Sequence, residues 1–363
     1  MNLRESWRRV AGAERNIGRL ARRLGGVVNI LFCSVPFRPS IGGIETVSAL
    51  LADRFHRAGH QVVLVTQTTS DSADTDAFEI VRRPRAARLA SLVTWADVVF
   101  HNNVSLRFAW PQLLVRRPWV VAHHTWIPTA GLAARVKRRV LGRASNISVS
   151  RSIAASLPVA STIVPNPYAD DLFVRTDLLA RAGDLVFVGR LVSDKGVDRL
   201  LDALALLVER RHDITLTVVG DGPEAASLRD RAEQLGVQDR VRFVGRRTGT
   251  ELVAILNAHR ILVVPSVWEE PFGVVVLEAM ACGCVPVVSR SGGLPEAVGD
   301  CGVVVDRASP VALADGIARL LTDAGALERF RAFAPEHLAR HSPDRIAQDY
   351  LGVIARAHAS ARR

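Results

Sequence analysis

Short runs of apolar, β-branched residues recur along the chain, and most are followed by a longer segment in which apolar residues return every three or four positions. The short runs have the composition of buried strands and the longer segments that of amphipathic helices. Alternation of the two is typical of a parallel sheet covered by helices on both faces. The strands expected in the first half are 27–35, 61–66, 78–82, 97–101, 119–123, 146–149 and 162–164.

The alternation is interrupted at Pro165-Asn166-Pro167 and by the polar stretch that runs to Gly183, which together have the composition of an interdomain linker. It then resumes, with expected strands at 185–188, 214–219, 241–244, 261–264, 285–288 and 303–305. The sequence therefore predicts an α/β protein with two doubly wound, Rossmann-like domains. Sheets of this kind bind ligands beyond the carboxyl ends of their strands, so a shared ligand is expected in a central cleft that both domains face.

The chain has 363 residues, of which 48% are hydrophobic, enough for two separate cores. No apolar run is long enough to span a membrane, and residues 1–24 hold seven arginines without the apolar centre of a secretory signal. The four cysteines show no zinc spacing and are expected to be small buried side chains. These features predict a cytoplasmic globular protein.

A formal net charge of +11 calls for an anionic partner: a nucleic acid, a membrane surface or a phosphorylated substrate. The arginines are spread along the chain without a nucleic-acid-binding motif, so no nucleic acid is expected. The basic segment 1–24 also carries apolar residues at helical spacing, namely Leu3, Trp7, Val10, Ile17, Leu20 and Leu24. It is either an interfacial helix on an anionic membrane, such as the inner face of the plasma membrane, or a solvated tail.

The strongest chemical signal is the segment EPFGVVVLE, in which Glu270 and Glu278 flank the point where an apolar strand gives way to a helix. The helix start would leave backbone amides unpaired and directed at the cleft, where they favour phosphate or sugar oxygens; these are the amides of Phe272, Gly273, Val274 and Val275. One carboxylate is placed to accept hydrogen bonds from a sugar and the other from a ribose diol. The alternative is a helix-terminal acid followed by a surface glutamate.

A second signal is the loop GRLVSDKG, which follows the expected strand 185–188 and carries Arg190 and Lys195. A guanidinium and an ammonium five residues apart could grip one diphosphate between them. When a nucleoside diphosphate departs, these fixed cations would stabilise the new negative charge. A solvated turn is the alternative.

Two weaker signals lie in the first half. Gly42 and Gly43 precede a helix and would let the backbone approach a ligand closely, although a tight turn would also explain them. His123 and His124 end the expected strand 119–123, and either could hydrogen-bond a sugar hydroxyl or serve as a satisfied polar residue.

Three other motifs predict no site. The segment from Gly220 to Ala225 matches a dinucleotide fingerprint, but no acid follows the next strand, so it is interpreted as a tight turn lining the pocket. Asp74-Thr-Asp76 resembles a metal-binding DxD motif but follows a polar loop. His56 and His60 are four residues apart without the glutamate of a zinc site. No metal is therefore expected.

Together these segments resemble glycosyltransferase family 4 from about residue 27 to the last helix. The matching stretches are GGIE at 42–45, DVVFHN at 97–102, VVAHHT at 120–125, VPNP at 164–167, FVGRLVSDKG at 187–196, VVGDGPE at 218–224, VRFVG at 241–245, EEPFGVVVLEAMACGCVPVV at 269–288 and GGLPEAV at 292–298. The resemblance implies the GT-B fold, with domains at 25–175 and 176–342 after the extension 1–24. It also implies that the C-terminal helix, in 343–363, crosses back to the first domain. Pro167 departs from the family, which often has glycine there.

The resemblance also implies roles for individual residues. Arg190 and Lys195 would bind the donor diphosphate, Glu270 the donor sugar, and His124 would lie beside that sugar. These four are the candidate catalytic residues. The candidate donor-binding residues are Gly42, Gly43, Gly189, Gly220, Arg246, Phe272, Gly273, Val274, Val275 and Glu278.

The implied reaction is retaining hexosyl transfer from a UDP- or GDP-sugar to an acceptor hydroxyl, by front-face displacement and without metal or other cofactor. The basic N-terminus favours a lipid-linked or cell-envelope glycan precursor as acceptor, as in polysaccharide biosynthesis. A sugar phosphorylase, a nucleotide-sugar epimerase or an inactive nucleotide-sugar-binding protein would keep most of these residues. The sequence leaves open the nucleobase, the sugar, the linkage and the oligomeric state.

Overall fold

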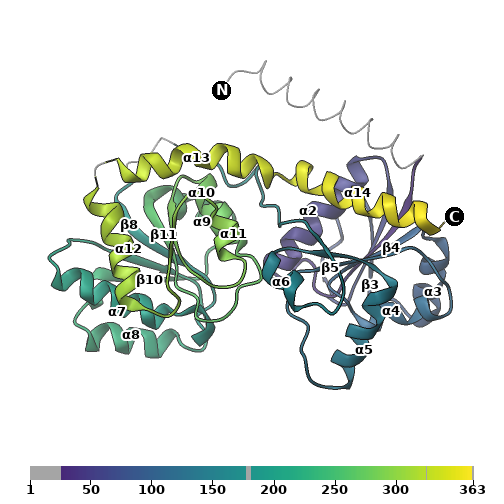
Figure 1. The fold of residues 1–363 in the computed structure, drawn as a ribbon, viewed down its shortest axis with the longest axis horizontal. Coiled ribbons are helices and arrows are strands. Elements are labelled where there is room, and N and C mark those ends of the chain that lie inside the picture. The colour runs from purple at the N-terminus through teal and green to yellow at the C-terminus, as the bar shows by residue number, and fades with distance from the viewer. Residues whose placement is uncertain (1–25, 177–180, 324, 362–363) are drawn as a thin grey trace, which may run out of the picture. The chain divides into compact units, whose positions relative to one another are not determined.

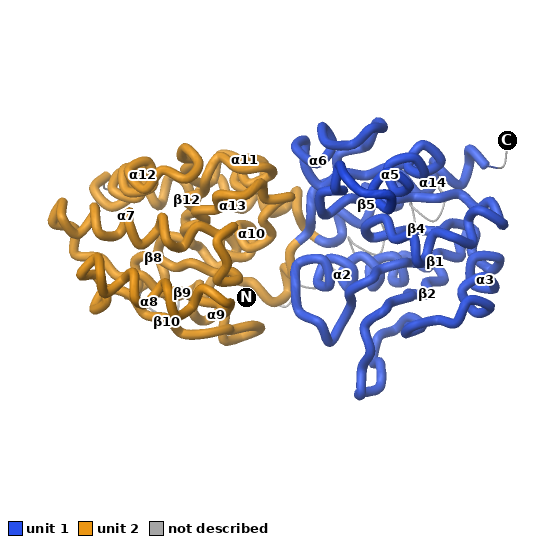
Figure 2. Tube along the Cα trace, turned by 90° about the horizontal axis from the view of Figure 1, so that it is seen from below, with its two compact units in different colours: residues 1–167, 343–363 blue, residues 168–342 orange. Residues whose placement is uncertain are grey.

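The protein forms two compact units in a computed structural model that describes residues 26–176, 181–323 and 325–361. The first unit comprises the chain up to Pro167 together with the last helix, which begins at Pro343. The second unit runs from Tyr168 to Ser342 (Figure 2). The predicted basic extension 1–24 lies outside the described residues.

The first unit is built on a seven-stranded sheet in which every neighbouring pair is parallel, with the order β3-β2-β1-β4-β5-β6-β7. Strands β3, β4 and β5 of this sheet are labelled in Figure 1. Its strands are β1 (Asn29–Ser34), β2 (Gln61–Thr66), β3 (Glu79–Arg82), β4 (Val98–Asn102), β5 (Trp119–His123), β6 (Ser145–Ser148) and β7 (Thr162–Ile163). Its helical segments are α2 (Gly43–Arg57), α3 (Ala86–Trp95), α4 (Leu106–Ala109), η1 (Trp110–Leu113), α5 (Leu132–Val140), η2 (Leu141–Arg143), α6 (Arg151–Ser156) and α14 (Pro343–Ala361).

Side chains alternate between the two faces of this sheet, because successive residues of a strand point in opposite directions. Leu31 and Cys33 of β1 pack into a core cluster that includes residues of α3. Phe32, between them, contacts Phe55 of α2 and Phe100 of β4, with ring centroids 6.0 and 4.7 Å away. Both faces are therefore apolar and covered.

Helix α14 belongs to the first unit although it follows the second unit in sequence. It packs on α2 and on strands β4, β5 and β6. Tyr350 is fully buried there, with its ring centroid 5.8 Å from that of Phe100. Arg54 of α2 pairs with Asp344 at 2.7 Å.

The second unit repeats the architecture with a six-stranded parallel sheet in the order β10-β9-β8-β11-β12-β13. Its strands are β8 (Gly183–Val188), β9 (Leu216–Val219), β10 (Val241–Gly245), β11 (His259–Val264), β12 (Val285–Ser289) and β13 (Val303–Val305). Its helical segments are η3 (Ser193–Lys195), α7 (Val197–Glu209), α8 (Ala225–Gln234), η4 (Gln238–Arg240), α9 (Gly249–Ala258), α10 (Val274–Ala281), α11 (Leu294–Val298), α12 (Pro310–Thr322) and α13 (Ala326–Arg340). Helices α7 and α12 share one core cluster with buried residues of five strands of this sheet, namely β8, β9, β11, β12 and β13.

The prediction of two doubly wound parallel sheets is confirmed, and each expected strand is present with ends that differ by no more than two residues. The division between the units falls after Pro167, whereas the sequence pattern predicts it after residue 175. The side chain of Asn257 explains the difference. Its amide accepts a hydrogen bond from the backbone of Thr176 at 2.7 Å and donates to that of Val174 at 3.0 Å, which ties this segment to the second unit.

Candidate functional site

The loops that leave the carboxyl edge of the second sheet are joined backbone to backbone. Leu191, after β8, donates to the carbonyl of Asp221, after β9, at 2.9 Å, and accepts from the amide of Glu224 at 3.1 Å. Gly220, the residue before Asp221, has φ +145°, and a Cβ there would lie 1.8 Å from the carbonyl oxygen of Gly189. Only glycine fits, so Gly189 and Gly220 set the spacing of these two loops. The interpretation of the segment from Gly220 as a tight turn agrees with this packing.

A second backbone contact orients the cationic loop. Asp194 accepts hydrogen bonds from the amides of Val267 at 3.0 Å and Trp268 at 3.3 Å, which follow β11. Gly196 has φ +67°, and a Cβ there would lie 2.3 Å from the carbonyl oxygen of Pro265. Because residues 194 and 196 are both fixed to the loop after β11, Lys195 must project beside that loop.

The side chain of Lys195 reaches Glu270 across this contact. Its Nζ lies 2.5 Å from Oε1 of Glu270, and the hydroxyl of Ser266 donates to the same oxygen at 2.7 Å. Both charged side chains are largely buried, with 26% of Lys195 and 15% of Glu270 exposed. A charge-assisted hydrogen bond in a poorly solvated site is strong and holds both groups in one geometry.

The turn after β12 supports Glu270 from behind. The amide of Gly293 donates to the Glu270 carbonyl at 2.7 Å, and a Cβ on Gly292 would lie 2.0 Å from that oxygen. The Glu270 amide also contacts the hydroxyl of Ser291 at 3.4 Å. The backbone of Glu270 is thus held by the amide of Gly293 and by Ser291, while its carboxylate is held by Lys195 and Ser266.

Helix α10 begins directly after this loop. Gly273 precedes it in a left-handed conformation, φ +105°, and Phe272 is 1% exposed, with its ring centroid 5.6 Å from that of His341. No described residue accepts a hydrogen bond from the amides of Phe272, Gly273, Val274 and Val275. Unpaired amides at the positive end of a helix form an anion site.

Glu278 lies in the second turn of the same helix and is partly buried. Desolvation raises its pKa to about 7. Burial destabilises the charged form of this carboxyl group. A ligand that donates hydrogen bonds to the carboxylate, as a ribose diol does, would stabilise that charged form.

Arg190 and Arg246 are exposed and follow β8 and β10 at the same edge of the sheet. Neither forms an ion pair with a residue in the described part of the chain. Of the predicted cations, the structure therefore brings Lys195 against a glutamate and leaves the two arginine side chains open to a ligand.

Three predicted residues lie in the first unit. Gly42 and Gly43 form the start of α2, where Glu45 accepts a hydrogen bond from Ser40 at 3.0 Å. A Cβ on Gly43 would meet nothing within 4 Å, so this position is open to a close approach.

The two histidines after β5 have different surroundings. His123 bonds the side chain of Asn146 at 3.0 Å and is part of a structural network. His124 is 4% exposed; burial lowers its pKa to about 3, against a smaller raising effect of Asn166. Its backbone amide donates to Asn103 at 2.8 Å. His124 is thus a neutral imidazole, and because it is buried, only a ligand in direct contact with it could form a hydrogen bond to the ring.

Sequence reasoning missed several supporting residues. Ser266 and Ser291 hold Glu270, and Asn103 anchors His124. Serine and asparagine are frequent in loops, so their types carried no signal. Their positions directly after β11, β12 and β4 were the available clue.

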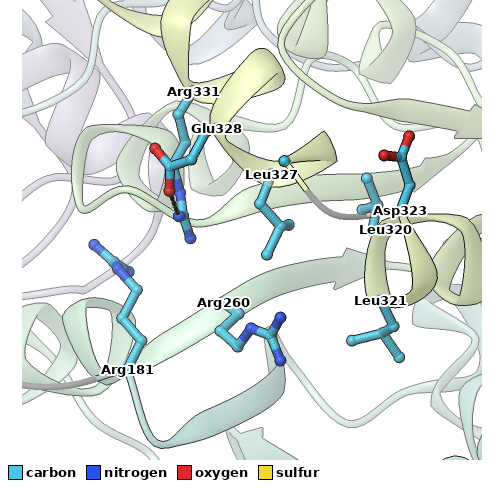
Figure 3. Close-up of a pocket in the computed structure, with 9 residues that line it drawn as sticks. Arg181, Arg260, Leu320, Leu321, Asp323, Leu327, Glu328 and Arg331 are labelled. Atoms are coloured by element: carbon cyan, nitrogen blue, oxygen red, sulfur yellow. Dashed lines mark hydrogen bonds and ion pairs between the residues drawn. The ribbon is translucent and has the colours of Figure 1, made fainter.

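A cavity of about 330 Å³ lies at the opposite, amino edge of the second sheet and is lined by Arg181, Arg260 and Arg331 (Figure 3). Arg181 donates to the carbonyls of His259 and Cys282 at 2.7 and 2.6 Å, and Arg331 donates to that of Gly283 at 2.8 Å. These guanidinium groups cap the carboxyl end of α10, where a helix favours cations. Their role there is structural.

Within residues 26–176, 181–323 and 325–361, no group of three or more His, Cys, Asp or Glu side chains is placed to hold a metal ion. All four cysteines are buried and unpaired with one another. In the same ranges, no helix combines the length and the apolar character that crossing a bilayer requires.

Known proteins resemble this chain in sequence and in fold. Residues 177–337 match the family model described as glycosyl transferases group 1. A D-inositol 3-phosphate glycosyltransferase from Salinispora tropica is 40% identical over 200 residues, which cover 52% of this chain and 41% of that protein. The chain thus matches about two fifths of the length of this relative.

Solved structures share the fold over nearly the whole chain. The structure of Anabaena Alr3699/HepE in complex with UDP has a TM-score of 0.76 at 20% identity and covers 90% of this chain and 100% of that one. Sucrose-phosphate synthase from Thermosynechococcus elongatus has a TM-score of 0.74 at 22% identity and covers 92% and 100%. Both match over the two-sheet architecture described above.

Proposed function

From the match of residues 177–337 to the model described as glycosyl transferases group 1, we propose that the protein is a retaining, metal-independent glycosyltransferase. It moves a hexose from a UDP- or GDP-sugar to an acceptor hydroxyl. One observation carries the proposal: a lysine and a glutamate, 75 residues apart in sequence, are paired at the carboxyl edge of a doubly wound sheet, the edge at which such sheets bind nucleotides.

The donor diphosphate binds where cations and unpaired amides gather. Arg190 and Lys195 supply positive charge, and the start of α10 supplies the amides that follow Glu270. As the bond to the sugar breaks, negative charge grows on the diphosphate. Groups already in place for that charge lower the barrier, because no reorganisation is needed at the moment of reaction.

Glu270 binds hydroxyls of the donor sugar and Glu278 the ribose diol. His124, a neutral imidazole, donates or accepts one hydrogen bond beside the sugar. The acceptor proton passes to a donor phosphate oxygen on the face from which the diphosphate leaves. This pathway needs no enzyme base and keeps the anomeric configuration.

The acceptor is a lipid-linked or cell-envelope glycan precursor, and the enzyme works at the inner face of the plasma membrane without crossing it. The net charge of +11 and the basic segment 1–24 support this. The names of relatives such as that from Salinispora tropica add a second candidate acceptor, an inositol phosphate.

A thermal-shift panel with UDP-, GDP- and ADP-sugars tests the donor, because a specific ligand stabilises the fold by mass action. Product analysis with the donor that gives a shift then tests the reaction. Transfer to an acceptor with retained configuration in the presence of EDTA supports the proposal. A product that forms without an acceptor identifies an epimerase, and a requirement for inorganic phosphate identifies a phosphorylase. Absence of any product with every donor that binds leaves a nucleotide-sugar-binding protein and overturns the proposal.

A further inference from the structure

Residues of helices α4 and α5 in the first unit line an apolar cavity of about 570 Å³. Both helices are labelled in Figure 1. Its lining includes Leu106, Trp110 and Leu113 on one side and Val136 and Val140 on the other. The volume is within the range of sites that hold small molecules or one chain of a larger amphiphile.

Exposed apolar side chains lie in the two segments that line this cavity. Leu113, Leu114 and Leu132 are 63%, 77% and 77% exposed, and Trp110 and Val136 are also exposed. Scattered exposed leucines need no explanation, but a gathering of large apolar side chains around one cavity marks an interaction surface. We call the surface of residues 106–114 and 132–143 the α4–α5 face.

The charge around the α4–α5 face is of one sign. Between Asp97 and Asp170 the chain has no acidic residue and nine basic ones. Arg116, Arg117 and Arg143 line the rim of the cavity. Arg116 and Arg143 form no ion pair with any described residue, so their charges are available to an anion.

We propose that the α4–α5 face docks on an anionic lipid bilayer, with an alkyl chain of a lipid in the cavity and lipid phosphates on the surrounding arginines. Apolar side chains that include Trp110 and Trp119, together with long cationic side chains at the same cavity, match the boundary between acyl chains and headgroups. A protein partner would need a surface that is both apolar and strongly acidic. A bilayer that contains anionic lipids provides both features along any part of its surface.

This inference goes beyond the proposed reaction, since it concerns neither the donor site nor the basic segment 1–24. Its test measures binding to vesicles and leaves catalysis out. Failure of the proposed transfer would therefore not be mistaken for failure of docking.

Vesicle flotation of the full chain is the first experiment, with vesicles of phosphatidylcholine alone or with about one third phosphatidylglycerol. Replacing both leucines, Leu113→Gln with Leu114→Gln, is expected to lower partitioning into the anionic vesicles at least about tenfold. Replacing two arginines, Arg116→Gln with Arg143→Gln, is expected to lower it about thirtyfold and to weaken its salt dependence. Matched controls on the second unit are Val311→Gln with Phe333→Gln, and Arg199→Gln with Arg319→Gln, which should partition like the unchanged protein.

A local probe separates this face from segment 1–24. The native cysteines are buried, so a single Leu113→Cys substitution can be labelled selectively with an environment-sensitive dye. Anionic vesicles are expected to shift its emission to the blue, and a dye at Val311→Cys should not respond. Equal responses at both positions, or unchanged partitioning of the leucine and arginine variants, would overturn the proposal.

Discussion

The ammonium of Lys195 lies 2.5 Å from Oε1 of Glu270, and the hydroxyl of Ser266 binds that same oxygen. These contacts hold the ammonium of Lys195 in place against the glutamate. A donor diphosphate that enters must compete for this ammonium or share it with the glutamate. The pair thus couples the group assigned to the diphosphate with the group assigned to the sugar.

We expect Lys195→Ala to lower kcat at least about a hundredfold, because one preorganised charge is lost from the leaving diphosphate. Glu270→Gln should lower kcat as well, and the double variant should lose less than the product of the two single effects, since the residues act as a pair. Steady-state kinetics of this four-member cycle measure the coupling. Lys137→Ala, the only other lysine of the chain, is the control for donor affinity and should not change it. Independent, fully additive effects would contradict the shared role.

The pKa of Glu278, raised to about 7 by desolvation, predicts pH-dependent donor binding. Below pH 7 the free protein carries a protonated carboxyl, which must lose its proton to accept both hydrogens of a ribose diol. The dissociation constant of a UDP-sugar, whose phosphates do not titrate in this range, should rise about tenfold between pH 7.5 and 5.5. Calorimetry of Glu278→Gln should show weaker binding with little dependence on pH. Parallel pH profiles for both proteins would count against Glu278 as the ribose ligand.

The same group makes a separate prediction about stability. A carboxyl whose folded-state pKa is raised binds its proton more tightly in the folded protein than in the unfolded one, so folding is penalised as pH rises from about 4.5 to 7. Glu278→Gln removes this penalty. The variant should be more stable above pH 7, by at most about 3 kcal/mol, and gain little at pH 4.5. Denaturant titrations at the two pH values check the sign, and a gain that is larger at the lower pH would refute it.

Two glycines predict opposite outcomes for the same substitution. Gly220→Ala places a methyl group 1.8 Å from a carbonyl oxygen in a backbone conformation of φ +145°, and should cost about 3 kcal/mol or more. Gly43→Ala meets nothing within 4 Å and should leave stability nearly unchanged. If the backbone at Gly43 approaches the donor phosphates, the latter variant should still bind donor more weakly. Thermal melts and donor titrations of both variants test this, and a Gly43→Ala protein with full affinity would remove that role.

The strands and the sheet architecture could be predicted from the sequence because each carries its own local pattern. The run Trp119–His123 is apolar, short and bounded by polar residues, and it forms a strand with the same ends. The unit boundary was harder to predict, since residues 168–176 mix polar and apolar side chains and form no helix or strand. What assigns them to the second unit is a side-chain contact with Asn257, which is distant in sequence.

The candidate site shows the same division. The sequence predicts that four charged residues follow two strands at one edge of the second sheet. In the structure, Arg190 and Lys195 follow β8, and Glu270 and Glu278 follow β11. The direct pairing of Lys195 with Glu270 depends on two contacts with the loop after β11. Gly196 packs against Pro265, and the backbone carbonyl of Asp194 accepts hydrogen bonds from that loop. Such contacts join segments about 70 residues apart, and no local pattern encodes them.

Helix α14 completes a core whose other parts lie at the opposite end of the chain. Its nineteen residues include the fully buried Tyr350, Ile346 and Ile354, without which β4 and α2 would expose apolar surface. On the ribosome, the second unit is synthesised as one continuous stretch and can fold as it emerges. The first unit, although made earlier, must wait for the final helix to close its core.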